Sequence, residues 1–303
     1  MKRLLAIAVL AVFVCGCTGQ GGTTDYGENI VVLKDKNVLP NPVSAGGSFD
    51  ISFVAQNVHA TEDAKNVMIR LYDWGPAACV VNAIGGQSVA KANSYMLLNE
   101  SRLPSGSERF IEIGGKAPSK AEIGGIASRC DFKYTVSYDS FAITTTDTSV
   151  ISQSRLSALQ RSGQTPTFTP TQTIGAGPIA ISFEHATSLP VREGDELVFD
   201  VKISDRGIGN YVKIPANTLQ ITVPEEFVAT QDGCGVEFYD AGVSNGKRTY
   251  TNSIELPLVK GSTSNYRCKF IAPAVVEERS FFITGRMDYT YVINDGISVD
   301  IIP

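Results

Sequence analysis

Histidine, the side chain most often used as a catalytic base, occurs only twice in this chain, at His59 and His185. A hydrolase needs such a base held against its nucleophile. Neither histidine is preceded by a Gly-x-Ser-x-Gly turn, and neither begins a His-Glu-x-x-His stretch, the pattern that binds zinc beside a general base. The residue types therefore predict a noncatalytic protein without a cofactor.

The chain has six cysteines, and the four outside its N-terminal segment are Cys79, Cys130, Cys234 and Cys268. An even number in an oxidising compartment indicates disulfides, and four cysteines allow three pairings. Pairing within each half, Cys79 with Cys130 and Cys234 with Cys268, would stabilise each half by about 3–4 kcal/mol. The rival is a zinc site, which the absence of a Cys-x-x-Cys pair disfavours.

Three loop carboxylates, Glu62, Asp63 and Asp205, could bind Ca²⁺ together with backbone carbonyls. Isolated acidic residues on an acidic protein are more often solvated, so we expect no metal site. Asn99 begins the sequon Asn99-Glu100-Ser101 and is a candidate glycosylation site.

Trp74 is the single tryptophan of the chain and follows a predicted strand, before Gly75-Pro76. Tryptophan is enriched at binding hot spots, so Trp74 is a candidate anchor for a partner. The alternative, which we favour, is a role in the core or as a cap beside Cys79.

The N-terminal segment predicts export. Lys2-Arg3 precede an apolar run from Leu4 to Val14, which is shorter than the roughly 20 residues that span a bilayer. The segment Val14-Cys15-Gly16-Cys17 resembles the lipobox of lipoproteins, and this resemblance implies that Cys17 carries a lipid. An ordinary cleaved signal and an uncleaved short anchor are the alternatives. All three place the rest of the chain outside the cell, and the lipid would hold it at the extracellular face of the membrane.

The charge pattern argues against a polyanionic partner. The 26 basic and 31 acidic residues give a net charge of −5 and are interspersed rather than grouped. Nucleic-acid and anionic-lipid binding leave a basic patch, which this sequence lacks. We therefore expect another envelope protein, or a second copy of this chain, as the partner.

From Ile30 onward, apolar residues alternate with polar ones and are interrupted by Gly, Pro, Asn and Asp. This period of two predicts half-buried β-strands. In the stretch from Ser48 to Ala55, for example, Phe49, Ile51 and Phe53 fall on one face. The predicted fold class is all-β, with strands stacked as sandwiches.

The second half of the chain repeats the plan of the first, with a turn glycine, an alternating strand, a polar loop and a further strand. The matching segments are Gly47–Gln56 with Gly194–Ile203, Asn57–Asn66 with Asp205–Asn210, and Val67–Asp73 with Thr218–Pro224. Two sandwiches in tandem are the simplest interpretation.

The sequence also predicts a β-hairpin at the end of each half. Asn294-Asp295-Gly296 separates two alternating runs, 288–293 and 297–302, and an Asp-Gly pair in that setting favours a tight turn. Asp139-Ser140 is its counterpart in the first half. Both pairs therefore predict a turn.

The glycine, strand, Asn-loop and strand pattern, with Asn57 and the Val67–Asp73 strand, resembles the CARDB-type cell-surface modules, which are immunoglobulin-like β-sandwiches. The resemblance implies two immunoglobulin-like sandwiches and a role in adhesion, and it implies no catalytic residues. In the first half, Val58-His59 stand where this family usually has glycine.

Between the halves, Leu156 and Leu159, with a serine cap at Ser152 or Ser154 and Gly163 as a stop, predict a short helix. A Thr/Pro-rich run follows, which we expect to be a plain linker; a glycosylated stalk or a hinge is the alternative. The expected organisation is a signal segment (1–17), a flexible tether (18–28), a first sandwich (29–151), a helix with linker (152–176) and a second sandwich (177–303).

These features predict a membrane-anchored, noncatalytic binding or adhesion module. One alternative is a structural subunit that self-assembles through edge strands or a donated tail strand. A second alternative is an accessory lipoprotein that binds a glycan or another small ligand.

Overall fold

The computed structural model describes residues 29–75, 79–209, 211–230, 233–259 and 263–303. The expected signal segment, the tether and Cys17 lie outside these described residues. The described chain forms 21 strands and a single helix, α1 (Gln153–Arg161). The predicted all-β class is therefore confirmed.

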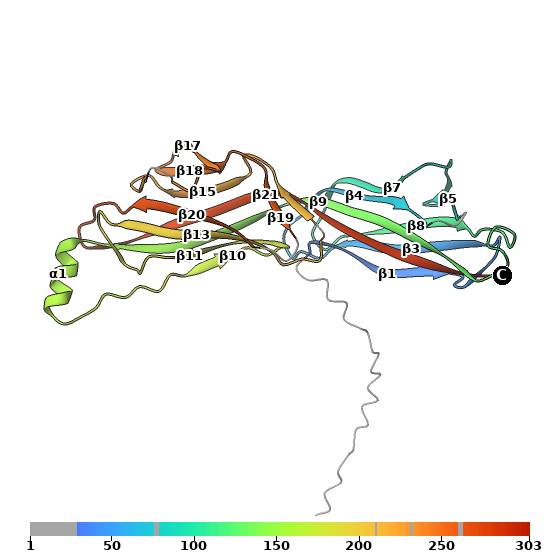
Figure 1. Cartoon of the computed structure of the whole chain (residues 1–303), viewed down its shortest axis with the longest axis horizontal. Coiled ribbons are helices and arrows are strands. Elements are labelled where there is room, and N and C mark those ends of the chain that lie inside the picture. Colours follow the sequence, from blue (N-terminus) through green and yellow to red (C-terminus); the bar gives the residue numbers. More distant parts are fainter. Residues whose placement is uncertain (1–28, 76–78, 210, 231–232, 260–262) are drawn as a thin grey trace, which may run out of the picture.

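Three sheets build the molecule (Figure 1). The five-stranded sheet has the order β1 (Val31–Leu39), β3 (Ser48–Asn57), β8 (Glu108–Lys116), β5 (Val80–Ile84) and β6 (Gln87–Ser88). The four-stranded sheet has the order β11 (Ile179–His185), β13 (Glu196–Asp205), β20 (Thr263–Ile271) and β16 (Val228–Ala229).

The third sheet, of twelve strands, is the backbone of the fold, and we call it the shared sheet. Its main path is β17 (Phe238–Ser244), β18 (Lys247–Asn252), β15 (Leu219–Pro224), β21 (Glu278–Ile302), β9 (Ser128–Ile151), β4 (Ala64–Asp73) and β7 (Tyr95–Leu103). Five shorter strands attach to this path: β2 (Val43–Ser44), β10 (Gln172–Ile174), β12 (Val191–Arg192), β14 (Tyr211–Ile214) and β19 (Leu256–Val259).

Two very long strands run through the whole shared sheet. β9 and β21 pair antiparallel without a register break, from Ile151 opposite Glu278 to Ser128 opposite Ile301. At about 3.3 Å per residue, this ribbon is roughly 80 Å long. The two predicted hairpins are therefore wrong, because Asp139-Ser140 and Asn294-Asp295-Gly296 both lie inside continuous strands.

The five-stranded and four-stranded sheets pack on opposite ends of the ribbon and give two lobes (Figure 1). In the N-terminal lobe, Phe49 of β3 meets Phe132 of β9, with ring centroids 5.6 Å apart. In the C-terminal lobe, Phe270 of β20 meets Tyr250 of β18 at 5.3 Å. Each lobe is thus a β-sandwich around its own aromatic core, and we call the region between them the waist.

Strand pairing divides the chain differently from the sequence pattern. β9 passes through the waist at Asp139 and Ser140. β21 passes through it at Thr290 and Tyr289, which pair with those two residues. Of the described residues, those within 29–139 and 290–303 therefore build the N-terminal lobe, and those within 140–289 build the other. The C-terminal lobe is in effect inserted between the last two strands of the N-terminal one. Two separate domains remain a prediction.

The predicted helix is confirmed as α1. The hydroxyl of Ser152 accepts a hydrogen bond from the backbone N–H of Arg155 at 3.2 Å, and Gly163 follows with φ +74°. The helix lies at the far tip of the C-terminal lobe (Figure 1). The Thr/Pro run returns along that lobe, and β10 pairs with β9, so this segment does not join the two lobes as a hinge.

Both predicted disulfides are present, Cys79–Cys130 and Cys234–Cys268. Cys79 immediately precedes β5 of the five-stranded sheet, whereas Cys130 lies on β9 of the shared sheet. The first disulfide therefore connects the two layers of the N-terminal lobe.

Candidate binding surfaces at the waist

The two histidines belong to different lobes, and the contacts of each are structural. The Nδ1 atom of His59 accepts hydrogen bonds from the backbone N–H groups of Glu62 at 2.9 Å and Thr61 at 3.4 Å, which shapes the loop after β3. The ring of His185 lies 6.2 Å from that of Phe199, and burial lowers the pKa of His185. The structure does not bring the two residues together.

One catalytic-looking pattern follows both histidines in the sequence, so the test of what precedes each histidine does not find it. Gly242-Val243-Ser244-Asn245-Gly246 fits the letters Gly-x-Ser-x-Gly. A nucleophile elbow needs a strand, a sharp turn and a helix. Here the segment joins β17 to β18, with φ of 51° at Asn245 and 71° at Gly246, as in a two-residue hairpin turn. The pattern is therefore a hairpin signal.

In the loop after β3, the carboxylate of Asp63 is used for internal bonding. The carboxylate of Asp63 accepts hydrogen bonds from the backbone N–H of Ser105 at 3.1 Å and from the guanidinium of Arg102, and these bonds lower the pKa of Asp63. Across the described residues, no three His, Cys, Asp or Glu side chains gather closely enough to hold a metal ion.

Corresponding residues organise the first loop and its counterpart in the second half. Asn57 ends β3, and its amide donates to the carbonyls of Glu62 at 2.8 Å and Leu103 at 3.0 Å. Asp205 ends β13, and its carboxylate accepts a hydrogen bond from the hydroxyl of Tyr291 at 3.0 Å. The repeat seen in the sequence thus places an Asn or Asp at the same end of equivalent strands, both facing the waist.

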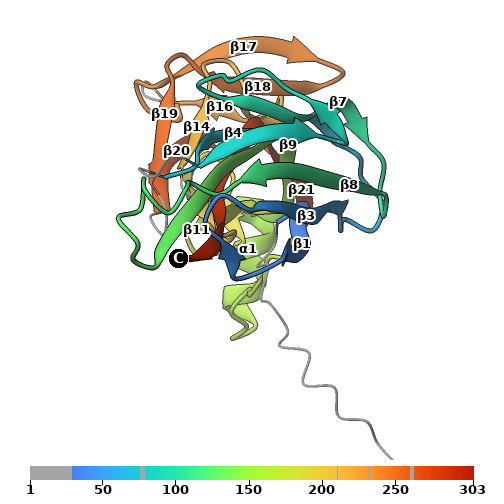
Figure 2. The same cartoon turned by 90° about the vertical axis from the view of Figure 1, so that its right-hand side faces the viewer.

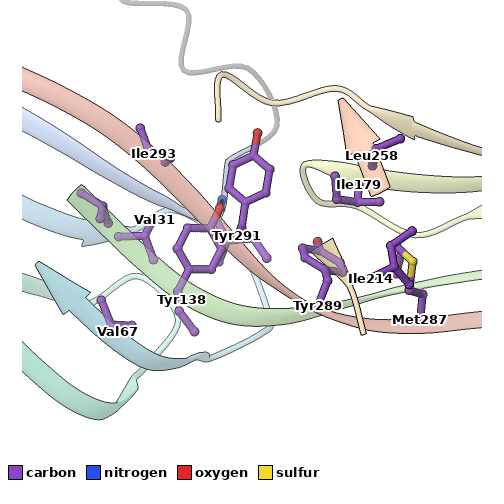
Figure 3. Packing of buried hydrophobic residues seen from close by; sticks show 14 of the residues in the cluster. Val31, Val67, Tyr138, Ile179, Ile214, Leu258, Met287, Tyr289, Tyr291 and Ile293 are labelled. Atoms are coloured by element: carbon purple, nitrogen blue, oxygen red, sulfur yellow. Dashed lines mark hydrogen bonds between the residues drawn. The ribbon is translucent and has the colours of Figure 1, made fainter. Parts of the chain in front are cut away.

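A tyrosine cluster fills the waist next to the loop that follows Asp205 at the end of β13 (Figure 3). Tyr138 and Tyr291 lie with ring centroids 5.7 Å apart, and the backbone N–H of Ile30 donates to the Tyr138 hydroxyl at 3.2 Å. A Cβ at Gly207 would lie 2.1 Å from the Tyr291 hydroxyl, and one at Gly209 would lie 2.4 Å from its ring. The glycines are therefore needed for the loop to close over Tyr291.

An open groove of about 640 Å³ crosses the other side of the waist, and we call it the outer waist groove. Both lobes contribute to it. The lining residues are Thr61, Glu62, Asp63, Lys65, Asp139, Ser140, Phe141, Pro215, Thr218, Arg286, Asp288, Tyr289 and Thr290.

The floor of the outer waist groove is fixed by hydrogen bonds. The carboxylate of Asp139 accepts from the amide of Asn66 at 2.7 Å and from the hydroxyl of Thr290 at 2.6 Å. The guanidinium of Arg286 lies 4.9 Å from the centre of the Phe141 ring. The groove thus offers carboxylates, hydroxyls and an aromatic edge, which suit a polar segment of a partner or a polar ligand.

The two remaining candidate residues lie in the N-terminal lobe. Trp74 is half-buried and packs on Tyr95, with ring centroids 5.4 Å apart, in agreement with a role in the core or as a cap. Asn99 is exposed on β7, an edge strand of the shared sheet (Figure 2). Its exposure is what a glycosylation site requires, and modification of Asn99 stays a prediction.

No protein-family model matches this chain, and no curated protein matches its sequence. Among solved structures, it is similar to the C-terminal globular domain of an oligosaccharyltransferase from Pyrococcus abyssi, with a TM-score of 0.27 and 10% identity over 87% of this chain and 46% of that chain. It is also similar to a chitinase from Bacillus thuringiensis, with a TM-score of 0.20 and 12% identity over 82% and 28%. This chain thus spans less than half of either protein, and neither likeness identifies a function.

No helix in the described part of the chain has the length and apolar character needed to cross a bilayer.

Proposed function

We propose that this protein is a noncatalytic binding or adhesion module, held at the extracellular face of the cell membrane by its N-terminal segment. The observation that carries the proposal is the outer waist groove, an open surface built jointly by two disulfide-bonded lobes. The resemblance of the sequence to CARDB-type adhesion modules agrees with this role.

The groove is preorganised for binding. Asn57 holds the first loop, Asp63 ties that loop to Ser105, and Asp139 fixes the floor. Loops that are already ordered lose little conformational entropy when a partner binds, so more of the contact energy appears as affinity. A rigid groove on a stable scaffold therefore fits recognition better than a mobile loop would.

Site-specific cross-linking tests this proposal. A photoreactive amino acid at Thr61, which is exposed in the groove, should capture a distinct envelope protein on intact cells. The matched control carries the same group at Ser162, which is exposed beside the distant helix α1. Identical products from both positions, or no product from Thr61, would contradict a binding role for the groove.

Anchoring is tested separately at Cys17. If Cys17 carries a lipid, the Cys17→Ser variant should leave the membrane fraction, and the N-terminal peptide of the parent protein should carry the mass of the lipid. A membrane-bound Cys17→Ser variant would instead favour the uncleaved anchor.

Self-assembly is the second candidate function, and β17 favours it. This edge strand of the shared sheet has six exposed residues in succession, and Tyr239 and Val243 are 45% and 47% exposed. An edge strand presents unpaired backbone groups to which another strand can add. Ordered filaments of purified protein in electron micrographs, lost on Val243→Pro, would support assembly, whereas a monomer at high concentration would contradict it.

A further inference from the structure

A second hollow, of about 410 Å³, lies where β1 runs past β21, and we call it the waist pocket. The register between β1 and β3 shifts between Lys34 and Asn37, and Asp35 within this bulge has φ +53°. A bulge bends its strand and opens local space. The pocket therefore results from a defined feature of the edge strand.

One part of the wall of the waist pocket is apolar, and charged and polar residues form the rest. Five of its lining side chains are at most 8% exposed, although they border the hollow: Val31, Val32, Leu33, Val136 and Ile293. They come from three strands, β1, β9 and β21. Such walls favour an apolar occupant, because contact with them removes apolar surface from water.

The charges that line the pocket balance one another. The lining contains Lys34, Asp35, Lys36 and Asp295, two cations and two anions. Lys36 forms an ion pair with Asp295, and Lys34 pairs with Glu108 at 2.6 Å. A lining without net charge gives no advantage to an ionic ligand over a neutral one.

One polar group of the pocket is unsatisfied. Asn29 is only 4% exposed, and its Oδ1 accepts a hydrogen bond from the backbone N–H of Ile208 at 3.4 Å. Its Nδ2, in contrast, has no acceptor among the described residues. A buried amide donor without an acceptor is unfavourable, and an oxygen atom of a ligand would satisfy it.

We propose that the waist pocket binds a neutral, largely apolar molecule that carries a hydrogen-bond-accepting oxygen, such as an acyl ester. The apolar body would lie against Val136 and Ile293, and the oxygen would accept from Nδ2 of Asn29. This binding is independent of the outer waist groove and of any partner protein.

Three probes with the same chain length separate the effects of the hydrogen-bond acceptor, the charge and the apolar chain on binding. Methyl laurate offers a neutral acceptor, laurate is charged, and dodecane has no acceptor. Each competes with Nile red for the chain from Thr18 to Pro303, which contains every described residue. Methyl laurate should bind roughly three- to tenfold more tightly than dodecane, as expected for one neutral hydrogen bond, and more tightly than laurate. Equal affinities for all three probes would refute the proposal.

Two variants locate the site. Asn29→Leu should abolish the preference for methyl laurate over dodecane while retaining dodecane binding, and Ile293→Trp should fill the pocket and abolish both. The matched controls are Asn99→Leu and Ile143→Trp, whose parent residues are exposed and do not line the pocket; Asn99 lies on β7, and Ile143 lies on the part of β9 in the C-terminal lobe. If Ile293→Trp unfolds, as judged by its Tm, Val32→Phe replaces it. Unchanged binding by a folded pocket-filling variant, or a preference that persists in Asn29→Leu, would overturn the assignment.

Discussion

A chain that ends at Ile151 should fail to fold, although its sequence resembles a complete sandwich. The N-terminal lobe is closed by the last part of β21, whose Tyr291, Ile293, Val299 and Ile301 are at most 6% exposed. At about 1.5–3 kcal/mol for each buried side chain, their loss removes roughly 6–12 kcal/mol. This equals most of the stability of a typical domain, about 5–15 kcal/mol.

The segment 141–151 is a poor substitute for the missing strand. If it folded back at Asp139-Ser140, the face that is now turned inward would offer Ala142 and Thr144. The next inward residues on that face, Thr146 and Thr148, are also threonines. Buried hydroxyls need partners and contribute less apolar surface than Ile or Val, so the hairpin form should remain unstable.

A matched fragment provides the positive control. Asp139 lies directly opposite Thr290, so an Asn-Gly turn can join residues 29–139 to residues 290–303 as a tight hairpin. Both fragments retain Cys79 and Cys130. The joined fragment should show a cooperative thermal transition by circular dichroism and dispersed amide resonances, whereas fragment 29–151 should show neither. Equal melting midpoints for the two fragments would refute the reasoning.

Three further predictions concern single side chains. Burial holds the pKa of His185 below its ordinary value near 6.5, so the unfolded chain binds more protons, and stability should fall as the pH drops below about 6.5. The difference in unfolding free energy between pH 7.5 and pH 5, measured by urea titration, should be smaller for His185→Phe than for the parent protein. An unchanged difference would contradict the role of His185. Arg267 donates two hydrogen bonds to the largely buried Asp200, at 2.8 and 3.0 Å, and lowers its pKa. Arg267→Gln should therefore lower the Tm, and it should do so much less in an Asp200→Asn background; additive losses would argue against the pair. Gly209→Ala should destabilise by about 1–3 kcal/mol in denaturant titrations, because its Cβ would lie 2.4 Å from the ring of Tyr291. In a Tyr291→Ala background, Gly209→Ala should lower the free energy of unfolding by much less. A wild-type denaturation midpoint for Gly209→Ala would contradict the close packing.

Local features of the fold could be predicted from the sequence. Alternation placed Phe49, Ile51 and Phe53 on one face, and all three are buried in β3. The helix followed from a serine cap and a stop glycine, which act over a few residues. The disulfides followed from the division of four cysteines between two repeats. Each of these features depends on neighbouring residues or on simple pairing.

The course of β9 and β21 could not be predicted, because alternation is the same in a hairpin and in a continuous strand. What decides between them is the partner strand, which lies far away in the sequence. Gly296 illustrates the ambiguity. The sequence predicts a turn at this glycine, but its φ is not positive. A Cβ there would lie 3.0 Å from the backbone carbonyl oxygen of Phe132. The glycine permits close strand packing instead of a turn.

The outer waist groove was only partly visible in the sequence. Glu62 and Asp63 were recognised as loop carboxylates, but Asp139 and Asp288 looked like ordinary residues of a turn and a strand. They reach the groove because β9 and β21 cross the waist side by side. The signal that would have found them is long-range pairing, which a single sequence does not carry.

If the proposed membrane anchor is attached, the place where the described chain enters the fold sets how the molecule stands on the cell. The described chain begins at Asn29 in the waist, where Ile30 bonds to Tyr138, and not at either tip (Figure 1). A tether joined there would hold the elongated body near its midpoint, with the long axis of the body across the direction of the tether. Rotation about that point would sweep a circle roughly 80 Å across. Neighbouring copies would then keep one another at a distance set by the length of β9 and β21.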